Sequence, residues 1–265
     1  MSLAARRYEA TLHRQQPENF LNHFSIALLR YRVACLVCSI TMHLRYILRK
    51  GVKEMKVLLV NGSPNQQGCT YTALQEVART LTEEGIETEI FWIGKKPIGG
   101  CIACHACRDI GRCVFQDAVN TFREKALTAD GFVFGSPVHY AALAGNMASF
   151  MDRVFYSEFN GNDNKAFYLK PAAAVISARR AGTTVSFDQM NKYFAIQEMP
   201  IVSSRYWNEV HGAVPEDVLQ DKEGLYTMRV LGRNMAYFLR CQEAARKAGI
   251  ALPKREDVVF TNFIH

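Results

Sequence analysis

The sequence predicts an α/β protein, a doubly wound, five-stranded parallel sheet with helices on both faces. First, short apolar segments alternate along residues 55–265 with longer segments of helical periodicity, as in strands joined by crossover helices. Second, polar loops that contain glycine follow predicted strands, at the edge where open sheets bind their ligands. Third, hydrophobic residues make up 49% of the 265-residue chain and charged residues 22%, a composition that allows a sizeable core.

The predicted elements follow one another in a regular order. The first predicted strand, Lys56-Val-Leu-Leu-Val-Asn61, is apolar, and the third is short, buried and ends at Gly135-Ser-Pro137. Strands are expected at residues 56–61, 87–92, 131–134, 172–176 and 200–203. Helices are expected at residues 70–84, 118–127, 143–155, 184–194 and 223–248. The last helix closes the domain and carries Cys241, which we expect in the core.

Residues 1–54 do not conform to this pattern. We therefore expect an N-terminal extension (1–54) and an α/β domain (55–265) that contains a cysteine-rich loop at residues 99–113. The extension holds nine Lys or Arg and three Glu, which gives it +6 of the chain's formal net charge of +7. The domain is nearly neutral, so we expect neither a nucleic-acid-binding surface nor membrane association on it.

The extension has two interpretations. Its longest apolar run, residues 33–42, is too short to span a bilayer, but residues 19–50 are compatible with an amphipathic helix on a membrane or on the main domain. Alternatively, translation begins at Met55, because Lys50-Gly-Val-Lys-Glu54 can be encoded by a purine-rich stretch that resembles a ribosome-binding site. N-terminal sequencing of the protein from its own host tests this hypothesis, and an intact first residue contradicts it.

The loop after the first predicted strand has the features of a phosphate cradle. In Asn61-Gly-Ser-Pro-Asn-Gln-Gln-Gly-Cys-Thr70, two glycines allow close backbone approach and several side chains are donors. The start of the next helix adds backbone N–H groups. The loop lacks the lysine of nucleotide triphosphatases and the glycine spacing of dinucleotide-binding loops. The simpler alternative is a polar turn that caps a helix.

Two further loops lie at the same predicted edge. Gly135-Ser-Pro-Val-His-Tyr140 carries His139 and Tyr140, which can flank a flat ring or serve only in packing. Ser177-Ala-Arg-Arg-Ala-Gly-Thr-Thr184 carries two cations. Either Arg179 or Arg180 can face a phosphate or an electron-rich ring, and the alternative is a solvated charged turn.

Four of the eight cysteines lie within residues 99–113 in the pattern C-x2-C-x2-C-x5-C, namely Cys101, Cys104, Cys107 and Cys113. This crowding, with no evident cleavable signal peptide, favours metal or redox chemistry in a reducing cytoplasm over a secreted disulfide framework. Thiolates on one compact loop suit a cubane iron–sulfur cluster, whereas zinc usually takes two well-separated C-x2-C pairs. Zinc, disulfides and a loop without a cluster stay open as alternatives.

Residues 55–265 resemble the flavodoxin-like NADPH-dependent FMN reductase family, and within it the iron–sulfur flavoproteins. The first loop, the cysteine motif, residues 135–140 with 145–153 and the tail at 261–265 carry the resemblance. It implies FMN as cofactor, NAD(P)H as co-substrate and a [4Fe–4S] cluster on Cys101, Cys104, Cys107 and Cys113. It also implies a homodimer or homotetramer in which one subunit's cluster lies near another subunit's flavin.

The resemblance implies a set of residues for the flavin. Those for the FMN phosphate are Ser63, Asn65, Gly68, Cys69 and Thr70. Those for the ring are Pro137, Val138, His139, Tyr140, Arg180, Ala181 and Gly182. Relatives usually have Tyr and then an aromatic residue after Pro-Val, whereas this chain has His139 and then Tyr140. A titratable group therefore lies near the flavin, and His139 is the one catalytic candidate.

We therefore expect an FMN-dependent oxidoreductase that passes electrons from NAD(P)H or a ferredoxin-like donor to an acceptor. One alternative is a cluster-free NAD(P)H-dependent FMN or quinone reductase. An alternative of another class is a non-catalytic flavin-binding redox carrier or sensor. Steady-state NAD(P)H oxidation separates an enzyme from a carrier, and iron and sulfide content separates the two enzymes.

Overall fold

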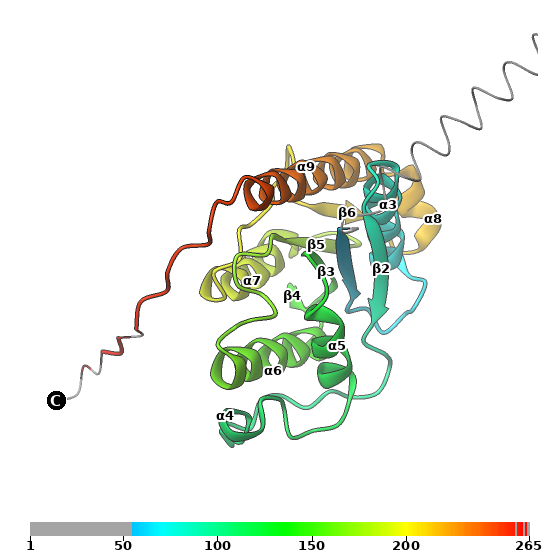
Figure 1. Cartoon of the computed structure of the whole chain (residues 1–265). Coiled ribbons are helices and arrows are strands. Elements are labelled where there is room, and N and C mark those ends of the chain that lie inside the picture. Colours follow the sequence, from blue (N-terminus) through cyan, green and yellow to red (C-terminus); the bar gives the residue numbers. More distant parts are fainter. Residues whose placement is uncertain (1–54, 258, 262, 264–265) are drawn as a thin grey trace, which may run out of the picture. The chain divides into compact units, whose positions relative to one another are not determined.

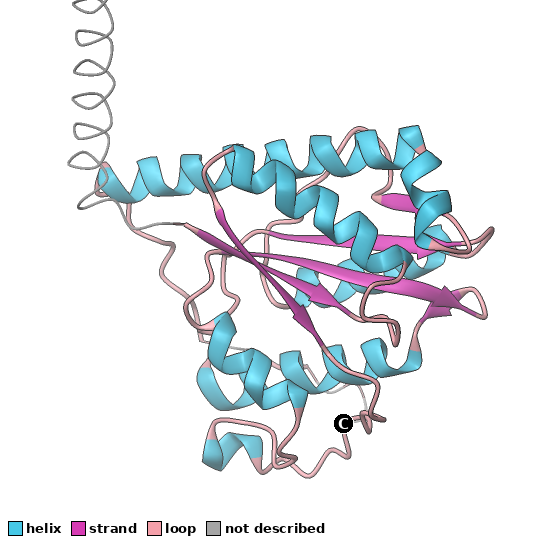
Figure 2. Cartoon of the chain, turned by 90° about the vertical axis from the view of Figure 1, so that its right-hand side faces the viewer, coloured by secondary structure: helices cyan, strands magenta, loops and turns pink. Residues whose placement is uncertain are grey.

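The computed structural model describes residues 55–257, 259–261 and 263, and it has three layers, with a parallel sheet between two layers of helices (Figures 1 and 2). This arrangement confirms the predicted doubly wound α/β fold. The expected extension at residues 1–54, its amphipathic helix and the start-site hypothesis lie outside the described residues. Among the helices that are described, none is long and apolar enough to cross a membrane.

The sheet has the strand order β2-β1-β3-β5-β6, and these five strands pair in parallel. A sixth, short strand, β4, pairs antiparallel with the end of β3. The strands are β1 (Lys56–Asn61), β2 (Glu87–Trp92), β3 (Gly131–His139), β4 (Ala142–Leu143), β5 (Ala172–Ala178) and β6 (Glu209–His211). Because β1 and β3 are central and apolar, their carboxyl ends hold the first and second predicted loops side by side.

The prediction of the fifth strand at residues 200–203 was wrong. Only Ile201 pairs there, as an isolated bridge with Ala172, and the parallel strand beside the end of β5 is β6. The sheet edge is thus split, with one segment beside the start of β5 and another beside its end. A strand was predicted at 200–203 because that segment is apolar. By contrast, β6 has a single apolar residue, Val210, and shows no strand pattern.

The helices divide between the two faces of the sheet. One face is covered by α5 (Ala118–Ala126), α6 (Gly145–Asn162) and α7 (Thr183–Ile196). The other is covered by α3 (Cys69–Glu83), α8 (Pro215–Gln220) and α9 (Lys222–Lys247). The short helix α4 (Cys107–Ile110), which the sequence pattern did not predict, packs against α6 away from the sheet (Figure 1). Cys241 on α9 is exposed, so its expected place in the core was wrong.

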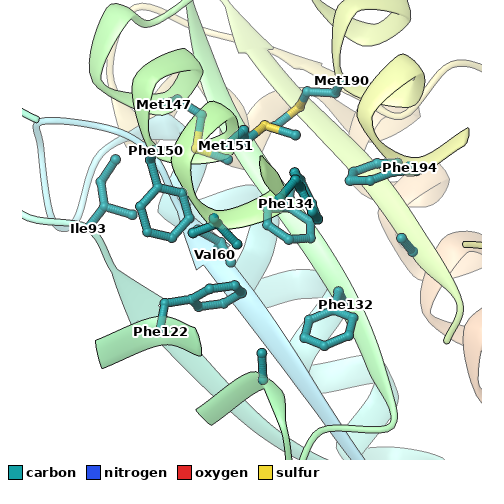
Figure 3. Packing of buried hydrophobic residues seen from close by; sticks show 14 of the residues in the cluster. Val60, Ile93, Phe122, Phe132, Phe134, Met147, Phe150, Met151, Met190 and Phe194 are labelled. Atoms are coloured by element: carbon teal, nitrogen blue, oxygen red, sulfur yellow. The ribbon is translucent and has the colours of Figure 1, made fainter. Parts of the chain in front are cut away.

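An aromatic cluster fixes α5 and α6 against the sheet. The Phe122 ring on α5 lies 5.8 Å from that of Phe134 on β3 and 5.2 Å from that of Phe150 on α6, both edge-on (Figure 3). Such pairs add stabilisation beyond the area that they bury. The cluster is fully buried, so the loops at both ends of α6 project from a rigid base.

Candidate functional site

A cavity of about 250 Å³ opens at the carboxyl ends of β1, β3 and β5, where the three predicted loops meet. Predicted residues that line it are Ser63, Asn65, Cys69, Thr70, Pro137, Val138 and His139. Residues that line it without having been assigned to the flavin are Pro64, Ser177, Ala178, Arg179, Gly212 and Ala213. The predicted residues Gly68, Tyr140, Arg180, Ala181 and Gly182 are not among its lining.

The first loop is held in shape by its own side chains. The Asn61 carboxamide oxygen accepts from the Ser63 N–H at 3.0 Å, and its amide donates to the Gln66 carbonyl at 2.9 Å. The Ser63 hydroxyl accepts from the Asn65 N–H at 3.1 Å, while the Trp92 indole donates to the Ser63 carbonyl at 2.8 Å. Asn61, fully buried at the end of β1, is therefore a positioning residue that the sequence reasoning did not single out.

The start of α3 provides the anion-binding end of the cavity. Its N-cap is Gly68, and in this described helix no side chain caps the first turn and no acidic residue lies in it. The positive end of the helix dipole therefore lies beside Ser63, and no carboxylate of the helix's own first turn competes with a ligand there. This chemistry fits a phosphate monoester, and it favours the cradle over the simple capped turn.

Two side chains tie the cradle to the other strands. The Thr70 hydroxyl lies 2.7 Å from the Ser177 hydroxyl at the end of β5, in a buried contact. The Cys69 thiol donates to the Gly212 carbonyl after β6 at 3.5 Å. Burial, and then the carboxylates of Asp217 and Glu216, raise the pKa of Cys69, so it stays a neutral thiol near pH 7. Gly212 was missed because it follows the strand that the sequence pattern did not reveal.

The second loop is a tight hairpin between β3 and β4. Its two turn residues, Tyr140 and Ala141, have φ of 49° and 58°, and the Tyr140 side chain is fully exposed. Non-glycine residues in this region are strained, and such strain gathers at functional sites. A Cβ on Gly182 (φ +97°) would lie 2.6 Å from the Ala141 Cα. Gly182 thus lets the third loop approach the hairpin, although it does not line the cavity.

The four clustered cysteines line a second, small pocket together with His105, Phe115, Arg153 and Tyr156. Ala103 and His105 have positive φ (51° and 57°), which turns the loop between the cysteines. Among the described residues, however, no group of three or more His, Cys, Asp or Glu is placed so that it could hold a metal ion. The thiols share one pocket without converging on one point.

The electrostatics of Cys107 show that the thiols interact. It is buried, and burial followed by the nearby Cys101, Cys104 and Cys113 raises its pKa. No carboxylate is among the described residues that line the pocket. Soft thiol donors without carboxylates suit an iron–sulfur cluster or zinc rather than magnesium or calcium. The residues present therefore fit a cluster in their chemistry, and a local closure of the loop would be needed for ligation.

The helix α6 carries the cysteine loop. Asn146 near its start binds the segment before the loop, accepting from the Ile98 N–H at 3.2 Å and donating to the Lys96 carbonyl at 3.1 Å. At its end, the Asn162 amide donates to the Gly111 carbonyl and to Glu158. Since α6 also begins directly after β4, one rigid helix connects the hairpin beside the first cavity with the cysteine pocket.

Gly161→Ala is expected to displace the cysteine loop. A Cβ at Gly161 would overlap the Cys107 carbonyl oxygen and lie 3.0 Å from the Gly111 Cα, both backbone atoms that cannot rotate away. We expect a net loss of about 1 kcal/mol in the free energy of unfolding after the gain in helix propensity, and a melting temperature lower by about 2–4 °C. Gly145→Ala on the same helix is the control, because nothing lies within 4 Å of its added Cβ. Equal melting temperatures for the two variants would contradict the prediction.

Comparison with known proteins identifies related sequences. The family described as NADPH-dependent FMN reductase matches residues 55–213. An iron–sulfur flavoprotein of Methanocaldococcus jannaschii is 31% identical over 191 residues, which cover 69% of this chain and 96% of that protein. An iron–sulfur flavoprotein of Methanosarcina thermophila is 30% identical over 164 residues, which cover 60% of this chain and 76% of that protein.

Solved structures share the fold. RosB aligns with a TM-score of 0.56 at 14% identity, covering 80% of this chain and 92% of its own. A flavone reductase aligns with a TM-score of 0.54 at 19% identity, covering 72% of this chain and 65% of its own. At these identities the likeness extends to the arrangement of strands and helices alone.

Proposed function

Because the chain belongs to the NADPH-dependent FMN reductase family, we propose that the cavity at the carboxyl edge of its sheet binds FMN and supports electron transfer. The observation that carries the proposal is the meeting of a helix start, hydroxyl groups and two strand-end loops around one cavity of about 250 Å³. A helix start favours the phosphate, and the loops after β3 and β5 leave room for a flat ring.

The residues divide by their chemistry. The phosphate lies against the start of α3, where the resemblance assigns it to Ser63, Asn65, Gly68, Cys69 and Thr70. The ring lies against residues 137–140, with Arg180, Ala181 and Gly182 from the third loop. The cavity supports Arg179 as a second cation for this role, since Arg179 lines it. Exposed His139 lines the cavity too and is the candidate for holding a proton near the ring.

We further propose that Cys101, Cys104, Cys107 and Cys113 ligate a [4Fe–4S] cluster. The pattern of the four cysteines, their shared pocket and the name of the related proteins support this assignment. When bound, FMN accepts a hydride from NAD(P)H, or electrons from a ferredoxin-like donor, and a nearby cluster carries single electrons. The chain's own residues would bind and orient these groups, and of the four thiols Cys107 is the buried one.

The same proposal extends to the organisation of the protein. Residues 55–265 form the FMN-binding domain, in agreement with a family match that begins at residue 55. The domain works as a homodimer or homotetramer in the cytoplasm, with the cluster of one subunit near the flavin of another.

The test is the visible spectrum of the full chain purified without oxygen, combined with flavin, iron and sulfide analysis. The proposal expects flavin bands over a broad absorbance, with about four iron and four sulfide per subunit. Flavin without iron would instead support a cluster-free NAD(P)H-dependent FMN or quinone reductase, which the unconverged thiols favour as the second candidate. Loss of both groups would contradict the assignment of the first cavity. Bound flavin without steady-state oxidation of NAD(P)H would support a non-catalytic redox carrier or sensor.

A further inference from the structure

Arg153 is a buried cation that binds both ends of the cysteine loop. It lies on α6 and is 2% exposed. One terminal nitrogen donates to an Asp117 carboxylate oxygen at 2.6 Å and to the Gly99 carbonyl at 3.4 Å. The other donates to Asp117 at 3.0 Å and to the Phe115 carbonyl at 3.5 Å. Gly99 precedes the first cysteine and Asp117 follows the last, so one side chain closes the loop.

The remaining donor of Arg153 is directed at sulfur. Its Nε–H donates to the Cys113 Sγ at 3.2 Å. A neutral thiol is a weak acceptor, whereas a thiolate that ligates a metal is a strong one. The forked bond to Asp117 already satisfies the cation, so structural bracing does not require the contact with sulfur. The geometry therefore suits a Cys113 sulfur that serves as a metal ligand.

We propose that Arg153 is a positioning residue that raises the reduction potential of the cluster by hydrogen-bonding its ligand Cys113. The inference rests on the proposed function, since it presumes that the four cysteines hold a cluster. Adding one electron to the cluster breaks no bond and places more negative charge on the ligand sulfurs. A buried cation 3.2 Å from one of these sulfurs stabilises that added charge.

The variant R153Q keeps an amide donor and removes the positive charge, while R153K keeps the charge but cannot fork to Asp117 and Cys113 together. The matched control is R123Q. Arg123 on α5 pairs with the fully buried Glu158 at 3.0 Å, so its loss also breaks a buried ion pair. The structure gives Arg123 bonds to Glu158 and Glu124, and no described bond of it goes to a cysteine.

The experiment is a potentiometric titration of the full-length protein with dithionite under argon, followed by electron paramagnetic resonance of the reduced cluster. At the midpoint potential of the native protein, we expect at least a tenfold lower ratio of reduced to oxidised cluster in R153Q. A tenfold ratio corresponds to about 59 mV for a one-electron couple. R153K should fall between R153Q and the native protein, and R123Q should match the native protein.

Four outcomes overturn the inference. A cluster in R153Q with the native potential shows that Arg153 only braces the loop, and so does an equal shift in R123Q. Loss of the cluster from both R153Q and R153K, with FMN retained, shows that Arg153 is needed for assembly of the cluster and is not a residue that sets its reduction potential. A native protein without iron removes the proposed cluster itself, and iron analysis distinguishes that failure from the others before any titration.

Discussion

Cys107→Ala is expected to remove iron from the protein and to leave FMN bound. Cys107 starts α4, is buried, and lies at the centre of the four-cysteine pattern. A cubane cluster needs all its ligand sulfurs to converge on one small volume, and alanine offers no replacement donor. We expect iron and sulfide to fall from about four per subunit to background, while the flavin content stays the same.

The control for this variant is Cys241→Ala, which removes an exposed cysteine on α9, outside the cysteine loop. It should retain full iron and full flavin. Iron retained in Cys107→Ala would exclude Cys107 as a ligand. Loss of flavin together with iron would show instead that the cysteine loop supports the first cavity, and the division into two sites would then be wrong.

Periodicity predicted most of the fold because most elements satisfy their own pattern locally. The first two strands were predicted with the bounds that the structure shows, and α5 and α9 within a residue at each end. These elements bury one face against a core, and the spacing of their apolar residues shows which face that is. The edge strand β6 was not predicted, because it is a strand through its backbone pairing with Ile176–Ala178 and not through a pattern of its own side chains.

The candidate site was predicted where chemistry and loop position coincide in the sequence. Ser63, Asn65 and Thr70 are close together in the sequence, in the first loop and at the start of α3, so a local pattern was enough. Gly212 reaches the cavity only through the order of the strands, whereas Ser177 begins the third predicted loop but was not assigned to the flavin. Arg153 stood in a quoted motif, yet its role depends on Asp117 and Cys113, 36 and 40 residues away. Tertiary contacts between residues so far apart in the chain produce no recognisable spacing in the sequence.

Gly62→Ala is expected to weaken FMN binding strongly. Gly62 follows β1 directly, and its N–H donates to the Gly135 carbonyl at 2.8 Å, which joins the first loop to β3. A Cβ there would lie 2.8 Å from the Gly135 carbonyl oxygen and 2.8 Å from the Met147 Cγ. Met147 is fully buried in the hydrophobic cluster and the Gly135 carbonyl belongs to the backbone of β3, so the loop has to shift outward from the strand (Figure 3). Overpacking of this kind costs about 1–3 kcal/mol.

If the strain falls on the cradle, the dissociation constant for FMN rises by about 5- to 150-fold, because each 1.4 kcal/mol is a factor of ten. Fluorescence titration of the apoprotein with FMN measures this directly. Gly99→Ala is the matched control, since it changes a loop glycine with nothing within 4 Å of the added Cβ and should leave the affinity unchanged. A lower melting temperature with native FMN affinity would show that Met147 and the core absorb the strain. The close approach of Gly62 to β3 would then serve packing, and the phosphate cradle would have to owe its shape to the Asn61 side chain instead.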